Sequence, residues 1–146
     1  MWQTGDTSAM NKKLPAEPLV WQPLNEIGKY GGTWRRPFTG PADGENGNRI
    51  QSSDKPLHWS ADGSSIVPCV AKGYQLSDDG KTYTLNLRKG MKWSDGAPFG
   101  ADDIVFWYKD VLLNKELTPS LPGWMKNPDG TAAVVEKVDD STVKFT

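Results

Sequence analysis

Six aspartates fall within residues 77–111, and closely spaced carboxylates are used in proteins for general acid–base catalysis and for binding metal ions. They are Asp78, Asp79, Asp95, Asp102, Asp103 and Asp110. The first three lie in or beside Asp-Gly dipeptides, which predict turns, because aspartate bonds its own backbone there. Asp102 and Asp103 open an apolar helical stripe, where each carboxylate stabilises the positive end of the helix dipole by about 0.3–1 kcal/mol. We therefore interpret these acids as structural.

Nucleophilic catalysis would have to use the single histidine and the single cysteine of the chain, His58 and Cys69. Both lie on adjoining strands of a predicted hairpin, so they could approach each other. A catalytic site also needs a third group that orients the base, and the sequence indicates none. We interpret Cys69 as a small buried side chain and His58 as a strand surface residue. We predict no catalytic residue and no enzymatic activity.

The residues around Gly130 partly match the pattern of a calcium-binding loop. With Gly130 at the sixth loop position, Asn127, Asp129 and Glu136 fall at the third, fifth and twelfth positions, but the first position is Met125, which cannot bind calcium. The flanking residues also read as a Pro-rich loop and a strand, not as two helices. No glycine-rich phosphate loop followed by Lys-Ser/Thr occurs either. The sequence therefore predicts no metal site and no cofactor.

The elements that carry these residues are predicted from composition and periodicity. The 146 residues include 15 glycines and 11 prolines, and only 36% are hydrophobic, which favours short strands joined by turns. One clear amphipathic helix is predicted over about residues 100–114, because an apolar stripe recurs at helical spacing with Gly100 at its N-cap. Its members are Ile104, Trp107, Tyr108 and Val111. We expect an α+β fold of β-hairpins and a small twisted sheet with this one main helix.

Hairpins are predicted at three places. Residues 57–67 form one around Asp62-Gly63, residues 72–90 form a second whose strand at 83–88 alternates apolar and polar, and residues 135–145 form a third. Residues 33–38 are expected to form a short strand, and the Pro-rich residues 1–28 an extended N-terminal arm. Because the sequence stops inside the last strand, we expect a truncated domain.

Bulk properties exclude several partners. With 17 basic and 18 acidic residues and no basic stripe, no nucleic-acid partner is expected. No apolar run approaches the ~18 residues that would cross a membrane. Most of the seven tryptophans are expected in the core, because tryptophan is highly buried on average. These observations point to a binding module.

Several motifs in order resemble the family 5 extracellular solute-binding proteins of ABC importers. They are Ser-Asp-Asp-Gly at 77–80, an aromatic-containing strand ending in Leu-Arg-x-Gly at 83–90, Trp-Ser-Asp-Gly at 93–96, and Ala-x-Asp at 101–103. The resemblance covers nearly all of residues 24–146. It departs at Gly100, where the family usually has Thr or Ser, a change expected to cost a few tenths of a kcal/mol. Family members are also several times longer.

The resemblance implies a part of a two-lobed periplasmic binding protein, with residues 29–146 as its N-terminal portion and the second lobe absent. It implies capture of a peptide or other small solute, delivery to the ABC permease subunits, a periplasmic or extracellular location, and a peripheral association with the membrane. The ligand wall would come from the loop at 40–48 and the segment at 122–124. The candidate ligand-binding residues are Gly40, Asp43, Asn46, Asn48 and Trp124. The alternative is a free-standing carbohydrate-binding β module; the sequence does not identify the solute.

Overall fold

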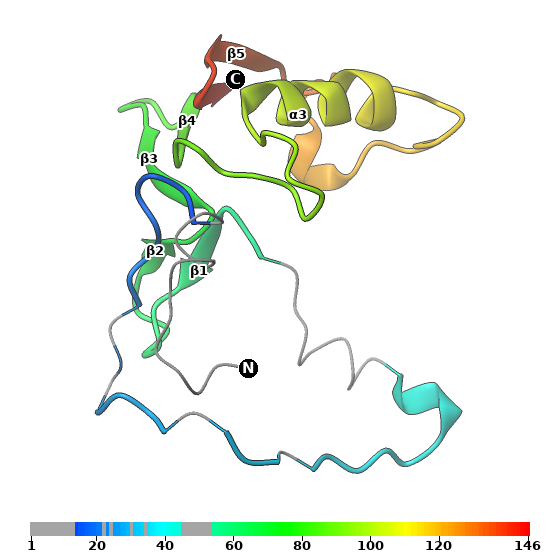
Figure 1. Cartoon of the computed structure of the whole chain (residues 1–146). Helices are drawn as coiled ribbons and strands as arrows, with labels where there is room; N and C mark the ends of the chain where they lie inside the picture. Colours follow the sequence, from blue (N-terminus) through cyan, green and yellow to red (C-terminus); the bar gives the residue numbers. More distant parts are fainter. Residues whose placement is uncertain (1–13, 22, 24, 30, 34, 45–53) are drawn as a thin grey trace.

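A computed structural model describes residues 14–21, 23, 25–29, 31–33, 35–44 and 54–146 (Figure 1). A single 3₁₀ turn, η1 (Pro41–Asp43), precedes the hairpin strands β1 (Leu57–Trp59) and β2 (Ile66–Pro68). Strands β3 (Ala71–Leu76) and β4 (Tyr83–Leu87) follow. The α-helix α3 (Ala101–Phe106) continues into η2 (Trp107–Leu112), and the 3₁₀ turn η3 (Gly123–Met125) leads to β5 (Val135–Asp139) and β6 (Thr142–Phe145).

The strands form two antiparallel sheets. Strands β1 and β2 pair with His58 opposite Val67, which confirms the first predicted hairpin. The second sheet has the order β3-β4-β6-β5, so the second and third predicted hairpins lie side by side through β4 and β6. Alternation along β4 sends Leu85 and Leu87 to the core face, where they are 2% and 3% exposed. The period-two pattern therefore predicted the buried face of the central strand correctly.

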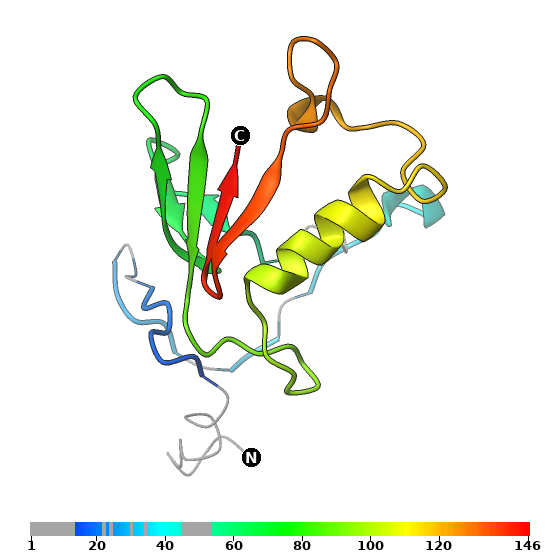
Figure 2. The ribbon, with the colours of Figure 1, turned by 90° about the horizontal axis from the view of Figure 1, so that it is seen from above.

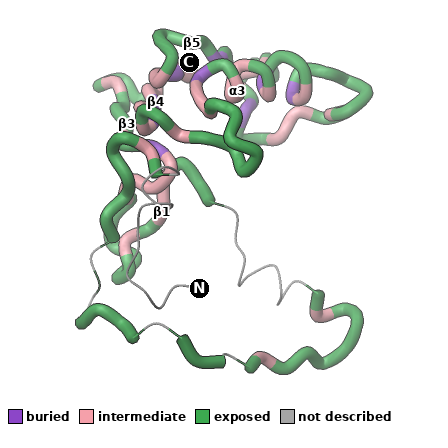
Figure 3. Tube along the Cα trace, in the orientation of Figure 1, coloured by how far each residue is buried: buried purple, intermediate pink, exposed green. Residues whose placement is uncertain are grey.

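The helix lies across one face of this sheet, as Figure 2 shows. Ala101, Tyr108 and Leu112 from the helix pack with Val135 and Val143 from β5 and β6, and this cluster is the larger part of the core. A second cluster, Ala71, Leu85 and Leu87, lies on β3 and β4. Figure 3 shows the buried segments gathered between the helix and the sheet. Each fully buried aliphatic side chain contributes about 1.5–3 kcal/mol.

The predicted helix at 100–114 is confirmed, but its second half is wound differently. Residues Trp107–Leu112 form a π-helix, and the Leu113 N–H donates to the Tyr108 carbonyl oxygen five residues earlier at 3.0 Å. Gly100 is the N-cap, and its N–H donates to Asp103 Oδ2 at 2.8 Å. None of the described helices has the length and apolar character needed to cross a membrane.

Two hairpin loops, at 60–65 and 77–82, close with the same hydrogen bonds. In the first, the Ser60 hydroxyl donates to Asp62 Oδ1 and accepts from the Ser65 N–H at 3.0 Å. In the second, the Ser77 hydroxyl donates to Asp79 Oδ1 at 2.6 Å and accepts from the Thr82 N–H at 2.8 Å. The aspartate in each loop also accepts a backbone N–H two residues later. The turn role predicted for Asp79 is thereby confirmed.

Two sequence-based expectations about the fold are wrong. Residues 33 and 35–38 join neither sheet, so the short strand predicted over 33–38 is not formed. A run of β-forming residues becomes a strand only where another strand pairs with its backbone.

The expectation that most tryptophans lie in the core is the second wrong one. Four of the five described tryptophans are at least half exposed: Trp21, Trp59, Trp93 and Trp124. They lie on the arm, on the edge of a small hairpin, in a loop and in η3, outside the two small core clusters.

Candidate ligand-binding surface

The predicted loop at 40–48 is partly described. Gly40 precedes η1 with a φ of 152°, a region that favours glycine, and the Asp43 carboxylate accepts hydrogen bonds from the Thr39 N–H at 3.2 Å and from the Thr39 hydroxyl at 3.4 Å. Asn46 and Asn48 lie outside the described residues. Asp43 therefore closes its own loop, and one carboxylate oxygen is used in doing so.

Trp124 lies on a different part of the molecule. It belongs to η3, is 71% exposed, and stacks in parallel on Trp107 of the helix, with ring centroids 6.1 Å apart and planes 1° apart. Figure 1 shows η1 well separated from the helix and the segment that follows it. The structure does not bring Trp124 together with Gly40 and Asp43, so the predicted ligand wall is not one continuous surface here.

Trp124 instead borders a surface that the sequence analysis did not single out, which we call the aromatic face. Two adjoining cavities of about 520 and about 430 Å³ share four residues there. The aromatic face comprises Pro56, Leu85, Trp93, Phe99, Ile104, Trp107, Trp124 and Phe145. The spacing of aromatic residues over positions 93–145 was the only feature of the sequence that could have indicated this face, but such spacing does not distinguish an exposed aromatic surface from a buried core.

Hydrogen bonds and ring contacts hold the aromatic face in place. The Trp93 indole N–H donates to Asp103 Oδ1 at 3.0 Å, and its ring meets Phe99 edge-on at 5.0 Å. Asp103 therefore serves both the helix start and the indole, through its two oxygens. Flat, fixed rings present a large apolar area at a low cost in side-chain entropy. The arrangement can bind apolar side chains or the apolar faces of ring-shaped ligands.

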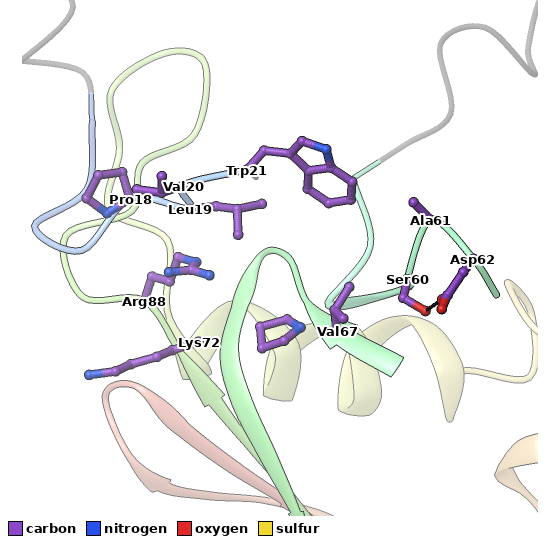
Figure 4. Close-up of a pocket in the computed structure, with 11 residues that line it drawn as sticks. Pro18, Leu19, Val20, Trp21, Ser60, Ala61, Asp62, Val67, Lys72 and Arg88 are labelled. Atoms are coloured by element: carbon purple, nitrogen blue, oxygen red, sulfur yellow. Dashed lines mark hydrogen bonds between the residues drawn. The ribbon is translucent and has the colours of Figure 1, made fainter. Parts of the chain in front are cut away.

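A separate pocket, of about 660 Å³, lies away from the aromatic face, between the arm and the β1–β2 hairpin (Figure 4). Leu19 and Trp21 lie on its arm side, and Val67 on its hairpin side. The arm is anchored next to it, because Arg88 donates to the Glu17 carbonyl oxygen at 3.0 Å and Lys72 forms a 2.9 Å ion pair with the Glu17 carboxylate. The pKa of Glu17 is lowered by this hydrogen bond and charge from Lys72.

Several of the acids that raised the possibility of catalysis or of calcium binding have structural partners. Asp95 accepts from the Ala97 N–H at 2.9 Å, and Asp102 pairs with Lys137 at 2.7 Å. The Asp129 carboxylate accepts from the Thr131 N–H and hydroxyl. Glu136, the last residue of the considered calcium pattern, pairs with Lys144 at 2.8 Å. No group of three or more possible metal-binding side chains occurs in the part of the chain that the structure describes.

The considered Cys–His site also lacks support from geometry. His58 lies opposite Val67 in the hairpin, and Cys69 follows β2 with its N–H donating to the Pro56 carbonyl oxygen at 3.1 Å. Cys69 is half-buried, as is His58. The Cys69 carbonyl oxygen accepts from the Arg88 side chain at 2.8 Å, so this residue contributes to the structure through its backbone.

Comparison with known proteins decides the family. A family model described as bacterial extracellular solute-binding proteins, family 5 middle, matches residues 65–146, more than half of the chain. The chain belongs to this family. The family expected from the motifs at 77–103 is therefore confirmed.

Individual relatives cover most of the chain but only part of their own length. The periplasmic alpha-galactoside-binding protein of Rhizobium meliloti is 31% identical over 99% of this chain and 23% of its own length. The dipeptide-binding protein of Escherichia coli is 31% identical over 68% of this chain and 22% of its own length. This chain thus spans less than a quarter of the length of these family 5 relatives.

A solved structure of the oligopeptide-binding protein OppA matches with a TM-score of 0.78 and 44% identity, over 92% of this chain and 20% of that one. This match confirms the predicted α+β fold, with one main helix and small antiparallel sheets, as part of a larger periplasmic binding protein architecture.

Proposed function

We propose that this chain forms part of the substrate-binding component of a peptide-type ABC importer. That component captures a peptide or other small solute outside the cytoplasmic membrane and delivers it to the permease subunits. The observation that carries the proposal is the match to the oligopeptide-binding protein OppA, at 44% identity over 92% of the chain. Relatives of this family are solute-binding proteins and not enzymes, which agrees with a role in binding alone.

The proposal assigns this chain one wall of a binding site. The described surface is open and apolar where Trp124 and Trp107 stack, and an open surface encloses little of a small ligand. We retain Gly40, Asp43, Asn46, Asn48 and Trp124 as the proposed ligand-facing residues, on two separate parts of that wall. The division into an arm at 1–28 and a solute-binding portion at 29–146, the location outside the cytoplasm and the peripheral membrane association belong to the same proposal.

A second candidate ligand class is an oligosaccharide. The alpha-galactoside-binding relative aligns with 99% of the chain, and the exposed indoles are suited to stacking on sugar rings. The tryptophan content raised the alternative of a free-standing carbohydrate-binding module. The second candidate retains the carbohydrate ligand of that alternative but assigns it to a solute-binding protein.

A chimera tests the proposal. This chain replaces the matching fifth of the oligopeptide-binding protein OppA, and calorimetry measures the binding of a tripeptide and of the trisaccharide raffinose. We expect the chimera to bind the tripeptide, and Trp124→Ala to weaken that binding by about tenfold, the effect of losing ~1.4 kcal/mol. Raffinose binding without tripeptide binding would favour the oligosaccharide. A chimera that unfolds cooperatively on heating but binds neither ligand would contradict the proposal.

The chain by itself provides the matched control. Because it supplies only one wall, we expect residues 1–146 alone to bind the tripeptide no more tightly than millimolar Kd, or about −4 kcal/mol. A micromolar Kd for the isolated chain would show that the other four fifths of the relatives' length are not needed, and would contradict the proposed division of the site.

A further inference from the structure

The face of the four-stranded sheet that points away from the core is polar, and we call it the outer face. It comprises Gly73, Gln75, Thr84, Asn86, Thr142 and Lys144, the residues that alternate with the buried ones. Pairing aligns three of them in one row across the sheet, because Gly73 lies opposite Asn86 and Asn86 lies opposite Thr142. This row lies on the opposite face of the sheet from Leu85 and Phe145 of the aromatic face.

Gly73 has no role in the fold that requires a glycine. Its φ is not positive, and a Cβ built at this position would meet no other atom within 4 Å. The strand register shifts between Ala71 and Gly73, but such a shift does not by itself exclude a side chain. A glycine inside a strand weakens it, and it often marks either a bulge or a place where a ligand approaches the backbone. The missing side chain leaves the space above Gly73 open.

That space is part of a cavity of about 560 Å³, within the size range of ligand sites. Two cationic and two anionic residues line it: Lys72, Lys89, Glu17 and Asp139. Lys72 is paired with Glu17 at 2.9 Å. Asp139 accepts hydrogen bonds from the Ser141 hydroxyl at 3.1 Å and from the Thr142 hydroxyl at 3.0 Å. The formal charges cancel, so the lining does not favour an ionic ligand of either sign.

One of the residues that line the cavity carries an amide. The Asn86 side chain is half-buried beside Gly73, and within the described part of the chain it has no hydrogen-bond partner. An amide offers two donors and one acceptor, and Gln75, which also lines the cavity, offers the same set. The hydroxyls of Ser141 and Thr142 extend the polar lining. Neutral groups that both donate and accept match the hydroxyl groups of a sugar.

We infer that the outer-face cavity over Gly73 binds a neutral sugar or polyol, with the Asn86 amide as its central hydrogen-bonding group. This site is distinct from the solute wall proposed above and does not depend on it. Gly73 supplies the space for the ligand, Asn86 and Thr142 supply hydrogen bonds, and the paired charges of Lys72 and Glu17 also line the cavity.

The test is an NMR titration of the full 146-residue chain with raffinose, a neutral trisaccharide. We expect backbone amide shifts to concentrate at Gly73, Asn86 and Thr142. Gly73→Ala should fill the space without disturbing the fold, since its Cβ meets nothing, and Asn86→Ala should remove the amide. Each is expected to weaken raffinose binding at least tenfold, with an unchanged or higher thermal midpoint for Gly73→Ala. Gly28→Ala is the matched control, because that glycine also has open space and no positive φ and does not line the cavity.

Several outcomes would overturn the inference. One is the absence of outer-face shifts up to about 50 mM raffinose, a concentration well above a millimolar Kd. Another is a set of shifts confined to Trp93, Trp107 and Trp124. A third is raffinose binding by Gly73→Ala that is as tight as binding by the parent chain. Stronger binding of gluconate than of raffinose would overturn the assignment to a neutral ligand. Because peptide binding by the OppA chimera uses other residues, failure here leaves that result unchanged, and the two failures are distinguishable.

Discussion

Replacing Gly100 by serine should destabilise the protein, although serine is a preferred helix N-cap. The reason is the close approach of the β5–β6 turn. A Cβ at residue 100 would lie 2.8 Å from the carbonyl oxygen of Asp140, and that oxygen accepts the Ala101 N–H at 3.0 Å. The backbone of Gly100 is extended, with φ −161°, so the restriction is one of space and not of backbone conformation.

The magnitude follows from the competing effects. A serine cap in place of glycine adds only a few tenths of a kcal/mol. Moving the Asp140 carbonyl away loses a hydrogen bond worth about 0.5–1.5 kcal/mol, and overpacking typically costs about 1–3 kcal/mol. The move would also strain the Lys137 ion pairs, since Lys137 joins Asp140 and Asp102 at 2.7 Å each. We expect a net loss of about 1–3 kcal/mol in the free energy of unfolding.

Urea denaturation followed by circular dichroism measures this loss from the shift of the midpoint at constant slope. Gly123→Ser is the control, because nothing lies within 4 Å of its built Cβ, and its effect should stay within about 0.5 kcal/mol. If Gly100→Ser is as stable as the parent or more stable, the turn yields without cost and the steric reasoning is refuted.

Three further predictions concern charge and packing. Hydrogen bonds from Ser60 and Ser64 lower the pKa of Asp62 from 3.8 to about 2. The contribution of Asp62 to stability is therefore present above pH 3.8 and is lost as pH falls through about 2. NMR titration should show the lowered pKa in the parent protein and a pKa closer to 3.8 in Ser60→Ala. The hydrogen bonds that Lys137 donates to Asp102 and Asp140 raise its pKa above 10.5, so its contribution to stability is present below pH 10.5 and is lost as pH rises further. Lys137→Met should therefore reduce the fall in thermal stability above pH 10.5, and an unchanged profile would exclude this linkage. Leu85→Ala, at a 2% exposed position on the central strand, should cost about 2–5 kcal/mol in urea denaturation, and a loss below ~1 kcal/mol would show that the core there is loose.

Local patterns in the sequence predicted the local elements well. The apolar stripe of Ile104 and Tyr108 identified the helix, and alternation around Leu85 identified the buried face of β4. The π-helical winding after Trp107 was missed, because a shift from i−4 to i−5 bonding leaves the apolar stripe almost unchanged. Strand residues 33–38 were misjudged because pairing depends on a partner far along the chain.

Long-range placement was the limit for the candidate site. The loop at 40–48 and the segment at 122–124 were grouped by resemblance, but η1 and η3 lie well apart in Figure 1, and no local pattern in the sequence predicts this separation. Tryptophan content measures how much apolar area a chain carries, but not which surface covers it. The stacking of Trp107 on Trp124 joins residues 17 positions apart through η3 and was visible only in three dimensions.

The two loops at 60–65 and 77–82 have the same closing hydrogen bonds between serine and aspartate. Each is closed by its own serine and aspartate, without help from the sheet it serves, so loop sequence and strand sequence are decoupled. Such a self-contained reversal of the chain can form on the microsecond scale of an isolated hairpin, about 1–10 μs, before distant strands have met. Folding of this chain can therefore begin at two independent points, and evolution can alter either pair of strands without redesigning the bend between them.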